Sequence, residues 1–331
     1  HIILMTINEF ENLSDELLMQ ILEYLDIYYM YTAFDGLNAR FNNILGDKHL
    51  KLTLDTKNIL YLKKFDIKTY IKRLVSLTVS CVIDPQFSLA QCCALEILTI
   101  TNDCDIQNIL QIIEILKNSS KLSTLVICKN SVNEKTLITL MIKLLFQNYL
   151  IQLKTLKICQ NYLLDFDTTN NITQKNNLVY LTIRCNLPTL LQILESSLNL
   201  KYLKVTDIMP GVKLARSISF DKILINLKHF RIHNCGISYN TLQRLIKLMP
   251  NLKWFELTAV TDERSDFVNG QKLQHLLLSS TIRFKLALAI LLESVDMVNI
   301  ILTTFQGNYW QNAKCWSSNG WLYKLTAIGG H

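Results

Sequence analysis

Apolar residues recur through the middle of the chain in a short motif of the form apolar-x-x-apolar-x-apolar. The motif begins at nine leucines, which are Leu74, Leu95, Leu122, Leu153, Leu178, Leu200, Leu227, Leu252 and Leu273. Successive side chains of a strand point to opposite faces, so each motif predicts a short strand whose apolar positions are buried. The copies follow one another at intervals of about 25 residues, which indicates a repeating architecture.

The segments between these motifs have the apolar spacing of helices. We expect helices over Ile106–Lys117, Lys135–Phe146, Leu187–Ser196 and Thr241–Met249. One strand and one helix cannot bury both of their apolar faces alone, whereas stacked repeats share one continuous core. The ninth position of the motif is asparagine or cysteine in four copies, at Asn130, Asn161, Asn186 and Cys235. Such a side chain can satisfy backbone groups where the chain turns away from the strand.

These features resemble the leucine-rich repeat, whose units are about 20 to 29 residues long. The resemblance covers about Leu74 to Thr281. It implies a curved solenoid with a parallel sheet on the concave side and helices on the convex side. A nonrepetitive α/β domain with coincidental leucines is the alternative.

Both flanks of the repeats carry their own patterns. Alternating leucines over His49–Leu54 predict an additional first strand, and Lys57–Arg73 reads as a basic, helix-like connector. After Thr281 the repeat register is lost, and we expect Ile282–Phe305 to be helical. A polar tail follows with Trp310, Trp316 and Trp321, which we expect to pack in a cap over the last repeat.

Near the N-terminus, cap residues divide an apolar stretch into three short helices. Ser14 is placed as the N-cap of a helix that begins at Asp15. Asp26 caps a second helix over Ile27–Phe34, Gly36 ends it, and Leu37–Leu45 forms a third. So small a unit buries little core alone, so we expect its surplus apolar face to meet a partner or the next domain.

The first of these helices resembles the opening of the F-box, Leu-Pro-x-Glu-Leu-Leu-x-x-Ile-Leu-x-Tyr-Leu. This chain reads Leu13-Ser14-Asp15-Glu16-Leu17-Leu18-Met19-Gln20-Ile21-Leu22-Glu23-Tyr24-Leu25. Ser14 replaces the usual proline, and Arg40-Phe41 stands where the family commonly has tryptophan. The resemblance implies that the segment binds the Skp-type adaptor of a cullin-RING ubiquitin ligase. The residues expected at that contact, some of which must instead fill the internal core, are Leu13, Leu17, Leu18, Ile21, Leu22, Leu25 and Phe41. An ordinary amphipathic helical cap is the alternative.

Together the two resemblances predict an α/β protein in four parts. These are a three-helix F-box domain over residues 8–47, a first strand and basic connector over 48–73, a leucine-rich-repeat solenoid over 74–281, and a C-terminal cap over 282–331. Half of the 331 residues are apolar, and there are only 9 glycines and 4 prolines. The chain is therefore globular, and we expect its domains to abut without a flexible linker.

The charge of the chain limits its expected binding partners, and its cysteine content indicates its cellular compartment. Lysine and arginine exceed aspartate and glutamate by 34 to 27, a modest surplus, and Asp55, Asp66 and Glu256 interleave with the basic residues. Nucleic-acid binding through the connector Lys57–Arg73 and the basic concave patch is therefore the weaker alternative, and net charge does not imply it. No secretion signal is visible, and the longest late apolar run, Leu286–Leu292, is far short of the roughly 20 residues of a membrane span. Nine cysteines without metal-site spacing indicate reduced thiols in the cytoplasm or the nucleus.

The positions between the buried leucines are expected to face the concave surface, and in the later repeats they change character. Early repeats have small or neutral residues such as Ser76 and Thr99 there. The later repeats offer aromatic and basic ones, namely Tyr180, Arg184, Tyr202, Lys204, His229, Arg231, His233 and Trp254. Aromatic and arginine side chains are enriched in binding hot spots, and basic clusters favour carboxylates or phosphates. We expect this patch to bind an acidic or phosphorylated protein segment; a solvated sheet face without a ligand is the alternative.

Cofactor and catalytic sites are not indicated. His229, His233 and His275 are expected on the concave face, but residues four apart on a strand are separated by about 13 Å, too far to share one metal ion. The chain has no glycine-rich phosphate loop, nucleophile elbow or Cys-x-x-Cys pair. We therefore expect a non-enzymatic ligase subunit, without cofactor, that holds a target near a ubiquitin-charged enzyme. A leucine-rich-repeat interaction scaffold without a ligase role is the alternative.

Overall fold

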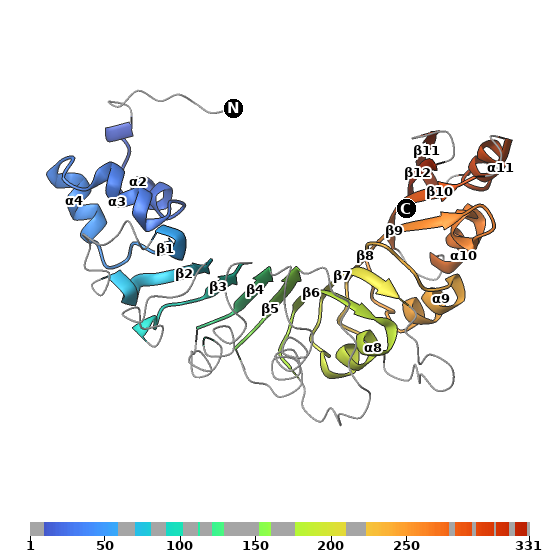
Figure 1. Ribbon diagram of the computed structural model, residues 1–331, viewed down its shortest axis with the longest axis horizontal. Coiled ribbons are helices and arrows are strands. Elements are labelled where there is room, and N and C mark those ends of the chain that lie inside the picture. The colour runs from blue at the N-terminus through green and yellow to red at the C-terminus, as the bar shows by residue number, and fades with distance from the viewer. Residues whose placement is uncertain are drawn as a thin grey trace. The chain divides into compact units, whose positions relative to one another are not determined.

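The computed structural model describes residues 10–58, 70–80, 91–101, 112, 121–128, 152–159, 176–209, 223–277, 282–292, 296–307, 309–317 and 322–329. Over these residues the chain is a mixed α/β protein whose strands are mostly parallel. It divides into two compact units, His1–Ser131 and Val132–His331. Figure 1 shows the order of the elements along the chain.

Three short helices begin the first unit, each started by a side-chain cap. They are α2 (Asp15–Leu22), α3 (Ile27–Phe34) and α4 (Ala39–Gly46). Ser14 Oγ accepts from Leu17 N at 3.4 Å, and Asp26 Oδ1 accepts from Tyr28 N at 2.8 Å. The starts of the first two helices are thus confirmed. The third helix begins at Ala39, later than predicted, because Asn38 is its cap.

Four parallel strands complete the described part of the first unit. They are β1 (Leu52–Asp55), β2 (Leu74–Val79), which follows the 3₁₀ turn η2 (Ile71–Arg73), β3 (Ile97–Ile100) and β4 (Thr124–Cys128). Leu77, Leu98 and Leu125 stand opposite one another in neighbouring strands and are fully buried. The helices attach to this sheet through Asp26, whose Oδ2 accepts from Asp55 N at 2.5 Å.

The second unit continues the same strand pattern. Its parallel strands are β5 (Thr155–Cys159), β6 (Tyr180–Asn186), β7 (Tyr202–Met209), β8 (His229–Ile232), β9 (Trp254–Asp262) and β10 (Arg283–Leu291). An antiparallel hairpin ends the sheet, with β12 (Leu322–Gly329) on β10 and β11 (Trp310–Ser317) on β12. Eight of the nine predicted strands are confirmed.

The described helices of the second unit lie along one side of its strands (Figure 1). They are α8 (Leu187–Ser196), α9 (Tyr239–Lys247), α10 (Gly270–Leu277), which follows the 3₁₀ turn η4 (Asp266–Val268), and α11 (Asp296–Thr304). The predicted bounds of α8 are confirmed, and its cap is Asn186, whose Oδ1 accepts from Thr189 N at 2.9 Å. Cys235, at the equivalent repeat position, is also buried.

Several predictions fall outside the described residues. These are the repeat asparagines Asn130 and Asn161, the tail residue Trp321, the predicted helix Lys135–Phe146, nearly all of Ile106–Lys117, and most of the connector Lys57–Arg73.

The ninth predicted strand, at Leu273, is wrong. Leu273 and Leu276 are buried residues of helix α10, because a spacing of three residues fits one face of a helix as well as it fits the repeat motif. The true next strand is β10, in a segment that we predicted to be helical. Its residues Phe284, Leu286, Leu288 and Ile290 are buried and alternate with more exposed positions, as in the preceding strands.

Gly270, at the start of α10, packs closely against the end of α11. A Cβ atom at Gly270 would lie 2.4 Å from the carbonyl oxygen of Thr304 at the end of α11. Trp310 Nε1 donates to the Gly270 carbonyl at 3.1 Å, and the Trp310 ring is buried against Phe305. The predicted packing role of this tryptophan is confirmed, whereas Trp316 is 46 % exposed.

Candidate functional site

The predicted adaptor-binding residues fall into two groups, and the first group is the core of the three helices. Leu18, Leu22 and Phe41 are completely buried. The Phe41 ring stacks on Phe34, with centroids 5.1 Å apart, and on Phe10, at 6.1 Å. Phenylalanine at this position therefore holds the helices together and is not open to a partner in this structure.

The second group lies on the surface of α2. Leu17 and Ile21 are 48 % and 39 % exposed, and Tyr24, just after the helix, is 91 % exposed. Spacings of four and three residues put these side chains on one face of a helix. Leu13 and Leu25 are half-buried. We call Leu17, Ile21 and Tyr24 the apolar stripe.

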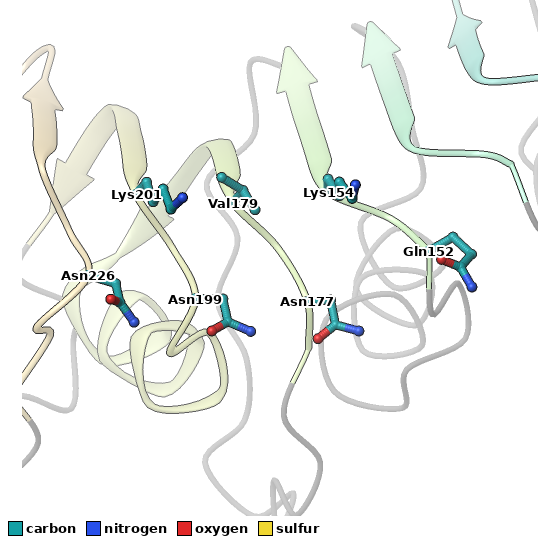
Figure 2. A pocket seen from close by; sticks show the side chains of 7 residues that line it. All are labelled: Gln152, Lys154, Asn177, Val179, Asn199, Lys201 and Asn226. Carbon is teal, nitrogen blue, oxygen red and sulfur yellow. The ribbon is translucent and has the colours of Figure 1, made fainter.

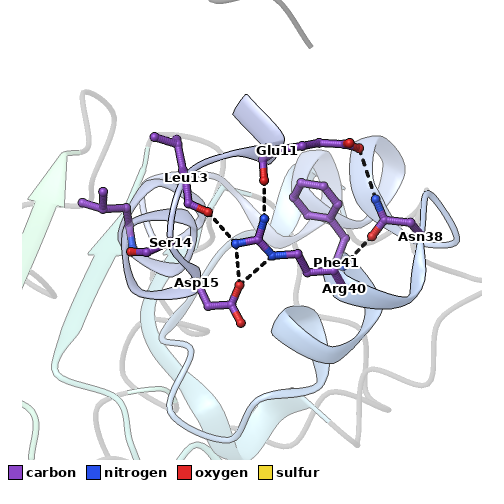
Figure 3. A network of polar contacts seen from close by, with 8 residues as sticks. Glu11, Leu13, Ser14, Asp15, Asn38, Arg40 and Phe41 are labelled. Atoms are coloured by element: carbon purple, nitrogen blue, oxygen red, sulfur yellow. Dashed lines mark hydrogen bonds and ion pairs between the residues drawn. The ribbon is translucent and has the colours of Figure 1, made fainter. Parts of the chain in front are cut away.

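Arg40 fixes the segment that leads into α2 (Figure 3). Its Nε donates to Asp15 Oδ1 at 2.7 Å, and its two terminal nitrogens donate to the backbone carbonyls of Glu11 and Leu13. Asn38 adds a hydrogen bond from Nδ2 to Glu11 Oε1 at 3.1 Å. One guanidinium thus ties α4 to the start of α2 and sets the position of the apolar stripe.

On the outward face of the second unit's sheet, the predicted aromatic residues form one row. Tyr180, Tyr202, His229 and Trp254 stand opposite one another in strands β6 to β9. The rings of Tyr180 and Tyr202 are 4.3 Å apart and 8° from parallel, and Tyr202 and His229 are 4.4 Å apart and 14° from parallel. The rings therefore stack on one another, so the faces of the central ring are covered. The indole Nε1 of Trp254 is buried and has no hydrogen-bond partner in this structure.

The next row of the same face is charged, and three of its four charges are paired with one another. Lys204, Arg231, Glu256 and Lys285 occupy matching positions on β7 to β10. Glu256 forms ion pairs on both sides, with Arg231 Nε at 3.3 Å and with Lys285 Nζ at 3.2 Å. The cation at Arg231 is therefore already neutralised in part, and an acidic ligand would compete with Glu256.

Arg184 is also paired, through an irregularity in the sheet. Ile183 stands opposite Val205 and Cys185 opposite Ile208, so β7 carries one extra residue here. The extra residue brings Asp207 beside Arg184, with Oδ2 2.6 Å from Nε. Both arginines of the predicted substrate patch therefore have internal carboxylate partners.

The histidines of this face are held in the neutral form. Burial, followed by the charges of Arg231, Lys228 and Lys253, lowers the pKa of His229. Burial and the charge of Lys204 are the main causes that lower the pKa of His233. Near neutral pH both rings act as polar aromatic groups without a charge.

The third predicted histidine lies elsewhere. His275 belongs to helix α10, so the prediction that it faces the sheet surface is wrong, for the same reason as the strand predicted at Leu273. Among the described residues, no group of three or more His, Cys, Asp or Glu side chains is arranged to hold a metal ion.

A second cationic feature, which the sequence analysis missed, runs along the edge where these strands begin. It consists of Lys154, Lys201, Lys228 and Lys253, all exposed, and we call it the basic ladder. Backbone hydrogen bonds keep its members in register: Lys228 N donates to Lys201 O at 2.9 Å and Lys253 N to Lys228 O at 2.8 Å. The signal was present in the sequence, because a lysine follows the first leucine of the motif in four of the five copies from Leu153 to Leu252.

A groove of about 360 Å³ lies on the same edge, between the segments that lead into β5 to β8. Its lining consists of Gln152, Lys154, Asn177, Val179, Asn199, Lys201 and Asn226. Figure 2 shows these side chains side by side on successive segments. Asn226 Nδ2 donates to Leu198 O at 2.9 Å, which joins one repeat to the one before it. The groove is thus rich in amides and positively charged, with no acidic residue in its lining.

The described cysteines are free thiols. Burial raises the pKa of Cys92 to about 12, and burial raises that of Cys235 to about 11. Cys185, inside the core, is shifted in the same direction for the same reason. These thiols stay protonated near neutral pH, so they serve as packing groups and not as nucleophiles.

Among the helices of the described ranges, none has the length and apolarity needed to cross a membrane. Comparison with known proteins leaves the family open: no model of a known protein family matches this chain, and no curated protein matches it either.

Proposed function

We propose that this chain is the substrate-recognition subunit of an SCF-type cullin-RING ubiquitin ligase. In this proposal α2 to α4 form an F-box that binds the Skp-type adaptor. The repeated strands and helices form a curved leucine-rich-repeat solenoid whose sheet face binds the protein to be ubiquitinated. The chain performs no bond chemistry; it raises the effective concentration of a target lysine near a ubiquitin-charged enzyme.

The observation that carries the proposal is the apolar stripe. The exposed side chains of Leu17 and Ile21 bury little apolar surface, so they add little to the stability of the isolated protein. Polar residues could occupy the same helix positions, so we infer that a partner covers the two side chains. The same helix buries Leu18 and Leu22 completely, so its two apolar faces have different roles. One face builds the unit and the other is open to a partner, which is the arrangement that an adaptor-binding helix requires.

The repeat region supports the second half of the proposal. Each described strand from β2 to β9 begins two residues or fewer after a buried motif leucine. Asn186 and Cys235 close their repeats from buried positions. Outward positions are thereby free to vary without disturbing the core, which suits a surface that recognises one particular protein.

Adaptor binding tests the proposal directly. We expect Ile21→Asp to weaken binding of purified Skp-type adaptor at least 10-fold, because burying an isoleucine side chain contributes about 1.5–3 kcal/mol. Calorimetry on the full chain measures the affinity, and circular dichroism checks the fold. Ile21 is partly exposed, so the variant should fold.

Val260→Asp is the matched control. Val260 is 63 % exposed on β9, far along the sequence from the helices, and this variant should bind the adaptor like the parent chain. If the parent chain itself fails to bind any Skp-type adaptor, the ligase function is excluded and a repeat scaffold remains.

A further inference from the structure

The basic ladder carries positive charge that no carboxylate of the described residues neutralises. Within the described residues no carboxylate lies in ion-pair distance of its four side chains, whereas Arg184, Arg231 and Lys285 all have such partners. Neighbouring strands are about 4.8 Å apart, so the ladder places like charges side by side along several repeats. An anionic ligand would relieve this repulsion, and its chemistry is set by what lies next to the ladder.

The groove beside the ladder favours a peptide as that ligand. Side-chain amides both donate and accept hydrogen bonds, so they match the alternating N–H and C=O groups of an extended backbone. The amides of Asn199 and Asn226 line the groove on neighbouring repeats, and Lys154 and Lys201 flank them. Backbone groups of a ligand can therefore meet amides while its acidic side chains meet lysines.

The aromatic row argues against nucleic acid at this edge. Proteins that bind single strands offer open aromatic faces on which bases stack. Here the rings of Tyr180, Tyr202 and His229 lie about 4.3 to 4.4 Å apart, in contact with one another, so no base can enter between them.

We propose that the basic ladder and its groove bind an extended segment of the substrate protein that is rich in anionic side chains, either carboxylates or phosphates. The ladder reaches across five successive strands, about 19 Å, which matches an extended peptide of about six residues. The proposal rests on the proposed function only in naming the ligand as the substrate. It assigns the binding of acidic groups to the lysines of the basic ladder. Arg184 and Arg231, which were predicted to bind them, already have carboxylate partners within the protein.

The test uses three fluorescein-labelled peptides of eight residues, in which serine alternates with glutamate, with phosphoserine or with glutamine. Fluorescence anisotropy with the full chain should show binding of the two anionic peptides and none of the glutamine peptide. The variant Lys201→Glu/Lys228→Glu should weaken that binding by about 10-fold or more, because rim charges set attraction and on-rate. The control Lys48→Glu/Lys247→Glu changes the net charge equally, at an exposed site in the turn after α4 and at another on α9, and should leave binding unchanged.

The outcomes separate the alternatives. Tighter binding of the phosphoserine peptide identifies phosphate as the anion, and equal binding shows that carboxylates suffice. Equal losses in the two double variants, or binding of the glutamine peptide, would overturn the proposal. Tighter binding of an oligothymidine that displaces the peptides would assign the edge to nucleic acid instead. Adaptor binding is measured on the same samples. If the adaptor does not bind while the peptides still bind the ladder, the proposed ligase function is refuted and the proposed peptide site is supported.

Discussion

The outward sheet faces of the two units differ although their strands are built alike. In β2 to β4 the outward positions hold small or uncharged residues such as Thr78, Thr99 and Val126. In β6 to β9 the same positions hold the aromatic row and the charged row described above. The repeat leucines thus determine the fold, and the outward residues determine which strands can contribute strongly to binding a partner.

The inward face differs too, in side-chain size. The central inward row of the first unit is made of leucines, Leu77, Leu98 and Leu125. In the second unit that row changes to phenylalanine at Phe230, Phe255 and Phe284, whose rings stack at 5.5 and 5.1 Å. The later repeats therefore carry larger side chains on both faces of the sheet.

Phe255→Ala should have the largest effect, because Phe255 is fully buried between two stacked rings. We expect a loss of about 3–5 kcal/mol in the free energy of unfolding, and less than about 1.5 kcal/mol for Phe255→Leu. All four tryptophans follow residue 253, so urea unfolding followed by tryptophan fluorescence reports on the second unit. Equal stability of the two variants would show that the phenylalanine row is not packed as described.

Tyr202→Ala should have an intermediate effect, because it removes both stacking contacts of the aromatic row. Such contacts contribute about 0.5–1.5 kcal/mol each, so we expect a loss of about 1–3 kcal/mol, with Tyr202→Phe close to the parent chain. Thr99→Ala, at an outward position of β3, is the matched control and should change stability by less than about 0.5 kcal/mol. Thermal unfolding by circular dichroism makes the comparison, and a similar loss in both alanine variants would refute the contrast between the faces.

Local signals in the sequence were enough to predict most elements. Ser14 and Asp26 are cap residues followed by apolar helical spacing, so the starts of α2 and α3 depend on neighbours a few residues away. The motif leucines predicted the strands because each is buried by the next repeat in an identical way. Where helix and strand both fit the spacing, as at Leu273, the sequence alone could not decide between them.

The candidate site was harder to predict, because it depends on which side chains meet. A one-residue bulge in β7 brings Asp207 to Arg184, and no alternation rule reveals a bulge. Glu256 stands between Arg231 and Lys285 only because β8, β9 and β10 pair in this register. The division of α2 into buried Leu18 and exposed Leu17 likewise depends on how α4 packs against it. The lysines of the basic ladder lie just before each strand, outside the alternating positions that predicted the substrate patch.

The smallest expected effect is on the pH dependence of stability. It again distinguishes the outward sheet faces of the two units, because His229 and His233 lie on the face of the second unit. The pKa values of His229 and His233 are lowered in the folded protein, so the unfolded chain binds more protons as the pH falls below about 6.5. The stability that the neutral rings contribute is complete above that pH and is lost as the pH falls toward their folded pKa values. We expect thermal unfolding temperatures of the parent chain to fall more between pH 7.5 and pH 5.5 than those of His229→Gln/His233→Gln, a window set by the unperturbed histidine pKa of about 6.5. The difference between the two proteins isolates the histidines from the carboxylates, and parallel curves would show that neither ring is held neutral.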